Sequence, residues 1–331
     1  MKTAVIGGGS WGSSFARYLG SIGLPSLLWI READIYREAL TTRENATFLA
    51  GFRFPDSVGF TDDPRESAAF GDIIFIAVPS QFCRSVYSRI APVLKRHQIV
   101  VSLTKGFDKK TLMRMSQVME EVFRPQVRPR LAVLSGPSFA KEVASGFPTA
   151  LVIASRDPAA AREVQHLISS LTVRAYTSTD VTGVEVAGAL KNVIAIAAGI
   201  ADGLKFGLNT RAALITRGLV EITNLGLALG ARRETFYGLA GIGDLILTCT
   251  GELSRNHRVG HELAKGRPLR EILAGMKMVA EGVHTTVAAR RISRALGVEM
   301  PISEQIYQVL YRGKPPKKAV EDLMSRTLKA E

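Results

Sequence analysis

A glycine-rich turn close to the N-terminus narrows the range of folds that this chain can adopt. The stretch VIGGGSWG places Gly7, Gly9 and Gly12 in the spacing G-x-G-x-x-G, directly after a short strand-like run at 2–6 and directly before a helical pattern. Glycines permit a tight turn and a close approach of the backbone to a ligand, and free N–H groups at a helix start bind a pyrophosphate. This context predicts a dinucleotide-binding fold rather than a glycine turn without a ligand.

Further apolar runs alternate with helical segments through the first half of the chain. They occupy residues 25–30, 72–80, 98–106, 130–138 and 149–155. Continuous apolar runs of this length are typical of strands that are buried on both faces of a parallel sheet. Because ligands of such sheets bind beyond the carboxyl ends of the strands, we expect Lys105 and Gly136 to lie at a cofactor-facing edge.

The pattern changes near residue 180. Long helical patterns rich in Ala, Leu and Ile replace the strands from there onward, and 331 residues are many for a single core. We expect an α/β fold in two domains. The N-terminal domain, residues 1–179, is a Rossmann-like parallel-sheet domain, and the C-terminal domain, residues 180–331, is all-α and binds the substrate.

Composition and hydropathy indicate a soluble protein. Hydrophobic residues make up 46% and charged residues 22% of the chain, which is ordinary for a globular fold. The apolar stretch 188–203 contains Lys191, Asn192 and Asp202, so we expect no membrane insertion. The first apolar run is interrupted at once by glycines and is no signal-peptide core, so we expect a cytoplasmic location.

The basic charge favours an anionic ligand. The formal net charge of +13 suits phosphates, and it also suits nonspecific association with nucleic acid. No helix-turn-helix or stacking-aromatic motif accompanies this charge, so we expect no nucleic-acid partner.

Neither the histidines nor the cysteines predict a metal site. His257 and His261 are four residues apart, but the order H-E-x-x-H and a third ligand are both absent. Cys83 and Cys249 stand far apart without a paired motif. We therefore expect no metal.

The end of the second predicted strand bears on the choice of cofactor. An arginine at this place accommodates the 2′-phosphate of NADP, whereas a carboxylate binds the ribose 2′-hydroxyl of NAD. Arg31 comes first and lies 19 positions beyond Gly12, and Glu32 follows it. The order favours NADP(H), and Glu32 leaves the use of NAD(H) open.

The second half of the chain carries a set of residues suited to acid–base chemistry on an anion. Lys191 lies in an otherwise apolar helical stretch, where an unpaired ammonium is costly. Asp244 follows a glycine-bearing turn, and Ser254, Arg255 and Asn256 lie near the start of another helix. A hydroxyl, a guanidinium, an amide and helix-start N–H groups can bind a phosphate together, although Ser254 could also cap a surface helix beside solvated arginines.

Longer motifs resemble one family along most of the chain. They are GGGSWG, AVPSQ at 77–81, TKGF at 104–107, SGPSFAKEVA at 135–144, VEVAGALKNVIAIAAGIADGL at 184–204, AGIGDLILTCTGELSRNHRVG at 240–260 and VAEGVHT at 279–285. In these stretches the sequence is similar to the NAD(P)-dependent glycerol-3-phosphate dehydrogenases of the bacterial type. Ser13, Ser14 and Phe15 depart from the family's more frequent Thr-Ala-Leu, which concerns helix packing more than chemistry.

The resemblance implies reversible reduction of dihydroxyacetone phosphate to sn-glycerol 3-phosphate for glycerophospholipid synthesis. It implies that Lys191 is the proton donor and acceptor and that Lys105 contacts both substrate and cofactor. The other residues that it places at the substrate are Gly136, Ser138, Asp244, Ser254, Arg255 and Asn256. The residues that it places at the cofactor, beside the three glycines and Lys105, are Ser10, Trp11, Arg31, Ala140, Arg255, Val279 and Glu281.

Two other functions and one assembly stay open on the sequence. A β-hydroxyacid dehydrogenase would also join a dinucleotide-binding domain to a helical domain with a lysine, but Ser254, Arg255 and Asn256 favour a phosphorylated substrate over a carboxylate. A nucleotide-sensing regulator would account for the charge and the glycine turn, and it would not account for Lys191. A homodimer is compatible with the sequence, which contains nothing that establishes it.

Overall fold

The computed structural model describes residues 1–328, and the chain divides into two compact units. The first unit is Met1–Glu185 and contains a sheet that ends at Ser178, and the second begins at Val186 and is helical. The predicted fold class, an α/β domain followed by a helical one, is confirmed. The domain boundary predicted between residues 179 and 180 lies in the short link between the last strand and the following helix and stays a prediction.

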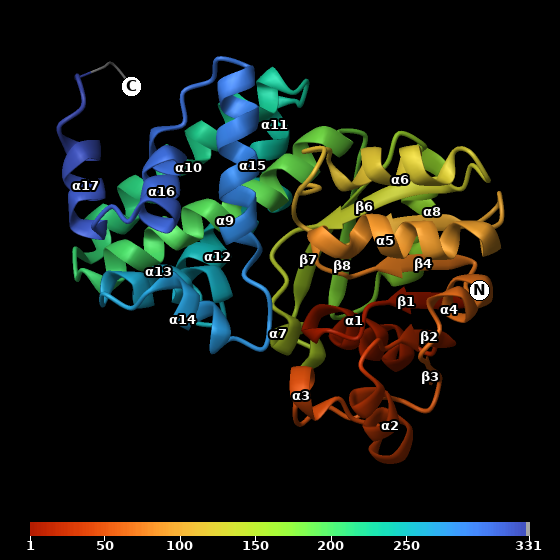
Figure 1. Cartoon of the computed structure of the whole chain (residues 1–331). Coiled ribbons are helices and arrows are strands. Elements are labelled where there is room, and N and C mark those ends of the chain that lie inside the picture. Colours follow the sequence, from red (N-terminus) through yellow and green to blue (C-terminus); the bar gives the residue numbers. More distant parts are fainter. Residues whose placement is uncertain (329–331) are drawn as a thin grey trace. The chain divides into compact units, whose positions relative to one another are not determined.

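The first unit is built on an eight-stranded sheet with the order β3-β2-β1-β4-β5-β6-β7-β8 (Figure 1). Neighbouring strands are parallel except β6 and β7, which are antiparallel. The strands are β1 Thr3–Ile6, β2 Ser26–Trp29, β3 Val58–Thr61, β4 Ile73–Ile76, β5 Ile99–Ser102, β6 Arg130–Ser135, β7 Thr149–Ala154 and β8 Val173–Ser178. The six strands expected from apolar runs are present.

Three features of the sheet differ from the sequence-based expectation. β3 and β8 were not expected, because β3 lies in an irregular segment with a glycine and β8 alternates buried with exposed polar residues at the sheet edge. The sheet is not wholly parallel, because the link between β6 and β7 does not cross back over it. The helix in that link, α7 (Ala140–Ala144), packs on α1 (Ser10–Ser21) instead, where Arg17 Nη1 donates to the Ala144 carbonyl at 2.6 Å.

Alternating strand residues build two cores, one on each face of the sheet. On one face Val5, Leu28 and Phe75 pack with helices α1, α2 and α8. On the other face Ala4, Ile6 and Ile74 pack with α4, α5 and α6. Because successive residues of the central strands β1, β4 and β5 point to the two cores in turn, every position in these strands is buried and nearly all are apolar. The other helices of this unit are α2 Ala33–Thr42, α3 Ala46–Leu49, α4 Pro64–Phe70, α5 Ser80–Ile90, η1 Ala91–Val93, α6 Met115–Phe123 and α8 Pro158–Ile168.

The helical unit is organised around α9 (Val181–Gly203), whose first turn still belongs to the first unit. Within residues 1–328, α9 is the one helix long and apolar enough to cross a bilayer, and its apolar window is entirely buried, as in the core helix of a soluble protein. The remaining elements are α10 Gly207–Ala228, α11 Arg233–Phe236, the π-helical turn η2 Leu239–Gly243, α12 Asp244–Thr250, α13 Arg255–Ala264, α14 Leu269–Ala274, α15 Glu281–Ala295, α16 Pro301–Arg312 and α17 Pro316–Met324.

A buried carboxylate on α10 caps another helix of this unit. Glu221 accepts hydrogen bonds from the Ile302 N–H at 2.5 Å and from the Ser303 N–H at 3.2 Å, at the start of α16. These N–H groups have no partner within their own helix, so the carboxylate satisfies them from outside. Burial nevertheless raises the pKa of Glu221 to about 7, because it outweighs the bonds from α16 and the distant charge of Arg326.

The raised pKa makes stability depend on pH. A glutamate whose pKa is higher in the folded than in the unfolded chain binds more protons when folded. Its contribution to the free energy of unfolding is therefore fully present below its unfolded pKa of 4.5 and is lost as pH rises through about 7. The free energy of unfolding that is lost in this way is about 3 kcal/mol. Urea unfolding of Glu221→Gln should therefore lack this part of the decline in unfolding free energy between about pH 5 and pH 8. Glu252→Gln, at an exposed loop position, serves as the control and should follow the wild-type curve; parallel curves for wild type and Glu221→Gln would contradict the account.

Candidate functional site

The polar residues singled out in the first unit gather at one edge of its sheet. β1, β2, β4, β5 and β6 run in the same direction, so their carboxyl ends meet at this edge. Gly7 follows β1, Arg31 comes shortly after β2, and Lys105 and Gly136 follow β5 and β6. The strand order reverses at β1, which is the place where doubly wound sheets bind their ligands.

The glycine turn has the geometry that a pyrophosphate requires. Gly7 has a φ of +123°, and a Cβ atom on Gly12 would lie 1.8 Å from the Gly7 carbonyl oxygen, so neither position accepts a side chain. Gly9 precedes α1, and a Cβ atom there would meet nothing within 4 Å. The first N–H groups of α1 point out of the helix toward this open side, where the helix dipole favours an anion.

A buried asparagine that the sequence analysis missed supports the turn. Asn45 Nδ2 donates to the Gly8 carbonyl at 2.8 Å and to Ser13 Oγ at 3.0 Å. Ser13 Oγ in turn donates to the same carbonyl at 3.1 Å. Asn45 also caps α3 through a bond from the Phe48 N–H, and this cap is the one local signal that could have drawn attention to it. The turn is therefore held from behind, and its N–H groups stay directed outward.

Three buried polar atoms close to the same edge have no hydrogen-bond partner within residues 1–328. They are Trp11 Nε1, in the first turn of α1, Gln81 Oε1, in the first turn of α5, and Ser135 Oγ, at the end of β6. Buried polar groups are nearly always paired, so these atoms suit a polar ligand bound at the edge. Together with the open side of Gly9, they fit a dinucleotide.

Arg31 is positioned by two neighbours. Its guanidinium donates to Glu32 Oε1 from Nε at 3.0 Å and from Nη2 at 2.5 Å, and it lies 5.5 Å from the centre of the Phe82 ring. The Arg31 side chain is 60% exposed. Arg31 is thus accessible to an anion, and Glu32 is the group with which that anion would compete.

Lys105, Gly136 and Ser138 form a second cluster at the edge. Lys105 Nζ donates to the Gly136 carbonyl at 3.0 Å, and Ser138 Oγ donates to the same oxygen at 2.9 Å. Ala140 begins α7, and its carbonyl accepts from Ser14 Oγ at 2.7 Å. Ser14, one of the residues that depart from the resembled family, thus ties the helix after the glycine turn to the segment that carries Ser138.

The second unit surrounds Lys191 with polar partners. Its Nζ donates to Asp244 Oδ1 at 2.5 Å and to Thr248 Oγ1 at 2.7 Å. The side chains of Lys191 and Asp244 are 7% and 1% exposed. Thr248 lies one turn after Asp244 on α12 and donates its own hydroxyl proton to the Asp244 carbonyl, so its lone pairs face the ammonium. Thr248 was not predicted; its signal is the spacing of four from Asp244 in a helical run.

The charge of the lysine is balanced by Asp244 rather than by the nearby thiol. Cys249 lies on the same helix as Asp244 and is fully buried. Burial raises the pKa of the Cys249 thiol to about 12, although the Lys191 cation opposes that shift. The thiol is therefore neutral near pH 7, and the carboxylate supplies the negative charge beside the ammonium.

Asn192 and Asn256 link three helices beside the lysine. Asn256 Nδ2 donates to Asn192 Oδ1 at 2.8 Å, and the Gly282 N–H at the start of α15 donates to Asn256 Oδ1 at 2.9 Å. A Cβ atom on Gly282 would lie 2.5 Å from the Asn192 carbonyl oxygen, so α15 approaches α9 closely here. Asn192 follows Lys191 directly in the sequence and was not among the predicted site residues.

The start of α13 is fixed against α9 by backbone contact. A Cβ atom on Gly199 would lie 1.9 Å from the His257 carbonyl oxygen, and one on Gly260 would lie 2.0 Å from the Ile196 carbonyl oxygen. His257 Nε2 lies 2.6 Å from Asp202 Oδ2, which adds a side-chain contact between the same helices. Residues 1–328 hold no group of three or more His, Cys, Asp or Glu side chains arranged for a metal ion.

The remaining predicted residues lie at the starts of α13 and α15. Ser254 is buried and caps α13 by accepting from the His257 N–H at 3.2 Å. Arg255 is exposed as the first residue of that helix. Glu281 is the first residue of α15, and Val279 comes shortly before it. The second unit therefore places a cation, an amide and a helix N-terminus within one short stretch beside Lys191, which suits an anionic substrate.

Sequence profiles of known families match both units. The profile described as NAD-dependent glycerol-3-phosphate dehydrogenase N-terminus matches residues 2–161. The profile described as NAD-dependent glycerol-3-phosphate dehydrogenase C-terminus matches residues 180–321. The glycine turn lies in the first match, and Lys191 with its partners lies in the second.

Full-length relatives agree with these profiles. A glycerol-3-phosphate dehydrogenase (NAD(P)+) of Geobacter sulfurreducens is 52% identical over 330 residues, which cover 100% of this chain and 98% of the relative. One of Solidesulfovibrio magneticus is 51% identical over 331 residues and covers 100% of both chains. The crystal structure of a glycerol-3-phosphate dehydrogenase of Coxiella burnetii has a TM-score of 0.94 and 36% identity, covering 98% of this chain and 99% of that one.

Proposed function

The chain belongs to the NAD-dependent glycerol-3-phosphate dehydrogenase family, and we propose that Lys191 is the general acid and base of the reaction. The protein is an NAD(P)-dependent oxidoreductase, a glycerol-3-phosphate dehydrogenase. The observation that carries the proposal is the buried Lys191 ammonium bonded to Asp244 and Thr248.

Lys191 supplies the proton in the direction of reduction. When bound, the cofactor supplies a hydride to C2 of dihydroxyacetone phosphate, and the C2 oxygen gains negative charge. The Lys191 ammonium stabilises that charge and donates a proton to the oxygen, which gives the secondary alcohol of sn-glycerol 3-phosphate. In the reverse direction the neutral amine accepts the same proton. Asp244 and Thr248 hold Nζ in place throughout, and Asp244 balances the charge of the protonated form.

The cofactor and the phosphate have separate sets of residues. Gly7, Gly9, Gly12 and the first N–H groups of α1 would hold the pyrophosphate, with Ser10 and Trp11 beside it. Ser254, Arg255 and Asn256 at the start of α13 would bind the substrate phosphate. The substrate residues assigned to the first unit are Lys105, Gly136 and Ser138. Ala140, Val279, Glu281 and the second contact of Arg255 complete the proposed cofactor set.

We further propose a preference for NADP(H), carried by Arg31. The guanidinium is exposed and bonded to Glu32, so a 2′-phosphate would replace a carboxylate as its partner. Arg31→Ala should lower kcat/KM for NADPH about 10- to 100-fold and leave that for NADH within about threefold, since hydrogen bonds to charged groups contribute about 1.5–3 kcal/mol. The measurement is the loss of absorbance of NADPH and of NADH with dihydroxyacetone phosphate.

Two further variants sharpen this test. Arg37→Ala removes an exposed arginine from α2 and should leave both cofactors unaffected. Glu32→Gln removes the competing carboxylate and should raise the NADPH to NADH ratio. An equal fall for both cofactors in Arg31→Ala would show that Arg31 does not read the 2′-phosphate. The same assay with 3-oxo acids in place of dihydroxyacetone phosphate should give negligible rates, because the phosphate site would be unfilled.

The place of the reaction in the cell follows from its product. We propose that the enzyme works in the cytoplasm and supplies sn-glycerol 3-phosphate as the backbone of glycerophospholipids. A phosphorylated three-carbon alcohol is the chemistry that later acyl transfer to two hydroxyl groups requires. Membership of the family favours a glycerol-3-phosphate dehydrogenase over the two alternatives considered from the sequence, a β-hydroxyacid dehydrogenase and a nucleotide-sensing regulator.

A further inference from the structure

The segment that carries Lys105 closes on itself just after the lysine. It links β5 to α6, and Phe107 and Arg114 form an isolated antiparallel bridge within it. The Asp108 N–H donates to the Met113 carbonyl at 2.9 Å, and the Leu112 N–H donates to the Asp108 carbonyl at 2.9 Å. Residues 107–114 thus form a closed loop, and its orientation sets the direction in which the chain leaves Lys105.

A buried carboxylate holds the interior of this loop. Asp108 Oδ2 accepts from the Thr111 N–H at 3.0 Å and from Thr111 Oγ1 at 2.6 Å. Leu112 has a φ of +60°, which a non-glycine residue adopts only when its surroundings impose it. Burial acts to raise the pKa of Asp108, but the bonds from Thr111 and the charge of Arg84 outweigh it and lower that pKa. Asp108 is therefore ionised at neutral pH.

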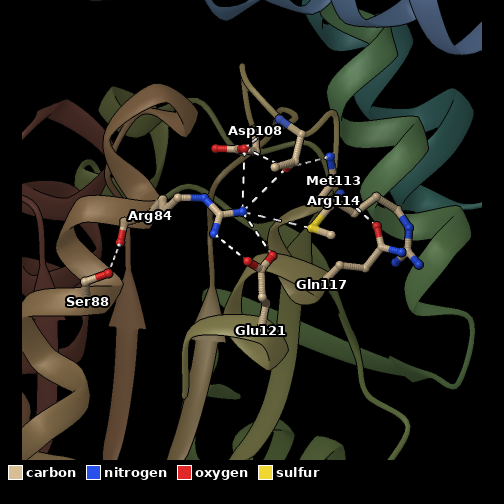
Figure 2. A network of polar contacts seen from close by, with 8 residues as sticks. Arg84, Ser88, Asp108, Met113, Arg114, Gln117 and Glu121 are labelled. Carbon is tan, nitrogen blue, oxygen red and sulfur yellow. Dashed lines mark hydrogen bonds and ion pairs between the residues drawn. The ribbon is translucent and has the colours of Figure 1, made fainter. Parts of the chain in front are cut away.

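Arg84 joins the loop to two helices (Figure 2). It lies on α5, and its Nη1 and Nη2 donate to the two carboxylate oxygens of Glu121 on α6, at 3.0 and 3.2 Å. Its Nη2 also lies 3.7 Å from Asp108 Oδ2 and donates to Thr111 Oγ1 at 3.5 Å. The Arg84 and Asp108 side chains are 28% and 7% exposed, so water screens the contact with the loop only in part. We call Arg84, Asp108 and Glu121 the arginine clamp.

The chain is also tied down on the other side of Lys105. Thr104 Oγ1 donates to the Val78 carbonyl at 2.7 Å, on the segment between β4 and α5. Lys105 and Gly106 therefore lie between one anchor at Thr104 and a second at the arginine clamp. The Lys105 side chain extends from this short span to the Gly136 carbonyl.

We propose that Arg84 is a positioning residue for Lys105, acting through the loop 107–114 that it fastens to α5 and α6. This inference rests on the proposed function, in which Lys105 contacts substrate and cofactor. Without Arg84 the loop has lost its link to α5 and its side-chain tie to Glu121, although it still continues directly into α6, and binding must then order it. The planar fork of arginine is needed for this link, because a single ammonium cannot reach Glu121 and Asp108 with the same geometry.

The test is a double-mutant cycle between Arg84 and Lys105. Arg84→Ala should raise KM for dihydroxyacetone phosphate about five- to tenfold, the effect of ordering a few side chains on binding, with kcat within about threefold. In the Lys105→Ala background, Arg84→Ala should raise KM no further, because its effect passes through the lysine. Arg89→Ala, an exposed arginine on α5 whose guanidinium lies over Trp29, is the matched control and should leave KM unchanged.

The outcomes distinguish a failure of the positioning role of Arg84 from a failure of the role assigned to Lys105. An equal rise of KM in both backgrounds, or no rise in either, overturns the positioning role. If Lys105→Ala alone leaves KM unchanged, the assigned role of Lys105 is wrong and the proposal fails with it. If Arg84→Ala does not fold, Glu121→Gln breaks the same clamp at a side chain that is 49% exposed and should raise KM in the wild-type background only.

Discussion

Lys191→Ala is expected to lower kcat by about 10²- to 10⁴-fold while the protein still binds NADPH, since positioned acid catalysis typically contributes that factor. The reason is that the Lys191 ammonium is the group proposed to protonate the substrate oxygen, and water cannot replace it at a side chain that is 7% exposed. Steady-state turnover of dihydroxyacetone phosphate measures the loss, and the change in NADPH fluorescence measures cofactor binding. Turnover within tenfold of the wild type would refute the assignment.

The substitution also leaves the Asp244 carboxylate buried without its cation, which destabilises the fold. The double variant Lys191→Met/Asp244→Asn removes both charges and separates the two effects. It should recover thermal stability relative to Lys191→Ala without recovering turnover. Lys317→Ala, at an exposed position on α17, controls for the loss of a lysine as such and should behave as the wild type does.

The second large effect is expected at Arg255. Arg255→Ala should lower kcat/KM for dihydroxyacetone phosphate about 10- to 100-fold, because a charge-assisted bond to a phosphate contributes about 1.5–3 kcal/mol. Arg255→Lys should have a kcat/KM between those of Arg255→Ala and the wild type, since lysine keeps the charge and lacks the planar fork. Kinetics with dihydroxyacetone, which has no phosphate, provide the decisive comparison: at saturating NADPH, which offsets the second contact of Arg255 with the cofactor, its low rate should be the same in Arg255→Ala and the wild type.

A neighbouring arginine gives the matched control for this prediction. Arg258 is exposed on the same helix, one turn beyond Arg255. Arg258→Ala changes the net charge by the same amount, so a general effect of charge on the anionic substrate would appear in both variants. Equal losses in Arg255→Ala and Arg258→Ala would mean that Arg255 makes no specific contact with the phosphate.

The parts of the fold that were predictable depend on local patterns. The run before Gly7, the glycine turn and the helix after it are contiguous, so one short stretch predicts both the strand and the binding turn. β8 escaped prediction because only one of its faces is buried and its other face is polar. The antiparallel direction of β7 was not predicted for a different reason. It goes with the packing of α7 on α1, and the residues of β7 themselves give no sign of that packing.

The candidate site divides in the same way. Lys191 was conspicuous because a charge in an apolar stretch is costly, and Arg255 because it lies in a polar helix start. Asn45 and Arg84 were not conspicuous in the sequence, since each is an ordinary polar residue whose partners lie elsewhere in the chain. Asn45 reaches Gly8, and Arg84 reaches Asp108 and Glu121. Neither partnership has a sequence spacing that would reveal it.

Local periodicity and the cost of burying a charge predict six of the eight strands, the glycine turn and one lysine in an apolar helix. The partners of that lysine come from distant parts of the chain. Asp244 and Thr248 lie 53 and 57 residues from Lys191 along the chain. The neighbouring amide of Asn256 is fixed beside α9 because Gly199 and Gly260 let the backbones of α9 and α13 touch. Contacts of this kind arise from how close two helices can pack, and that distance is set by every side chain between them.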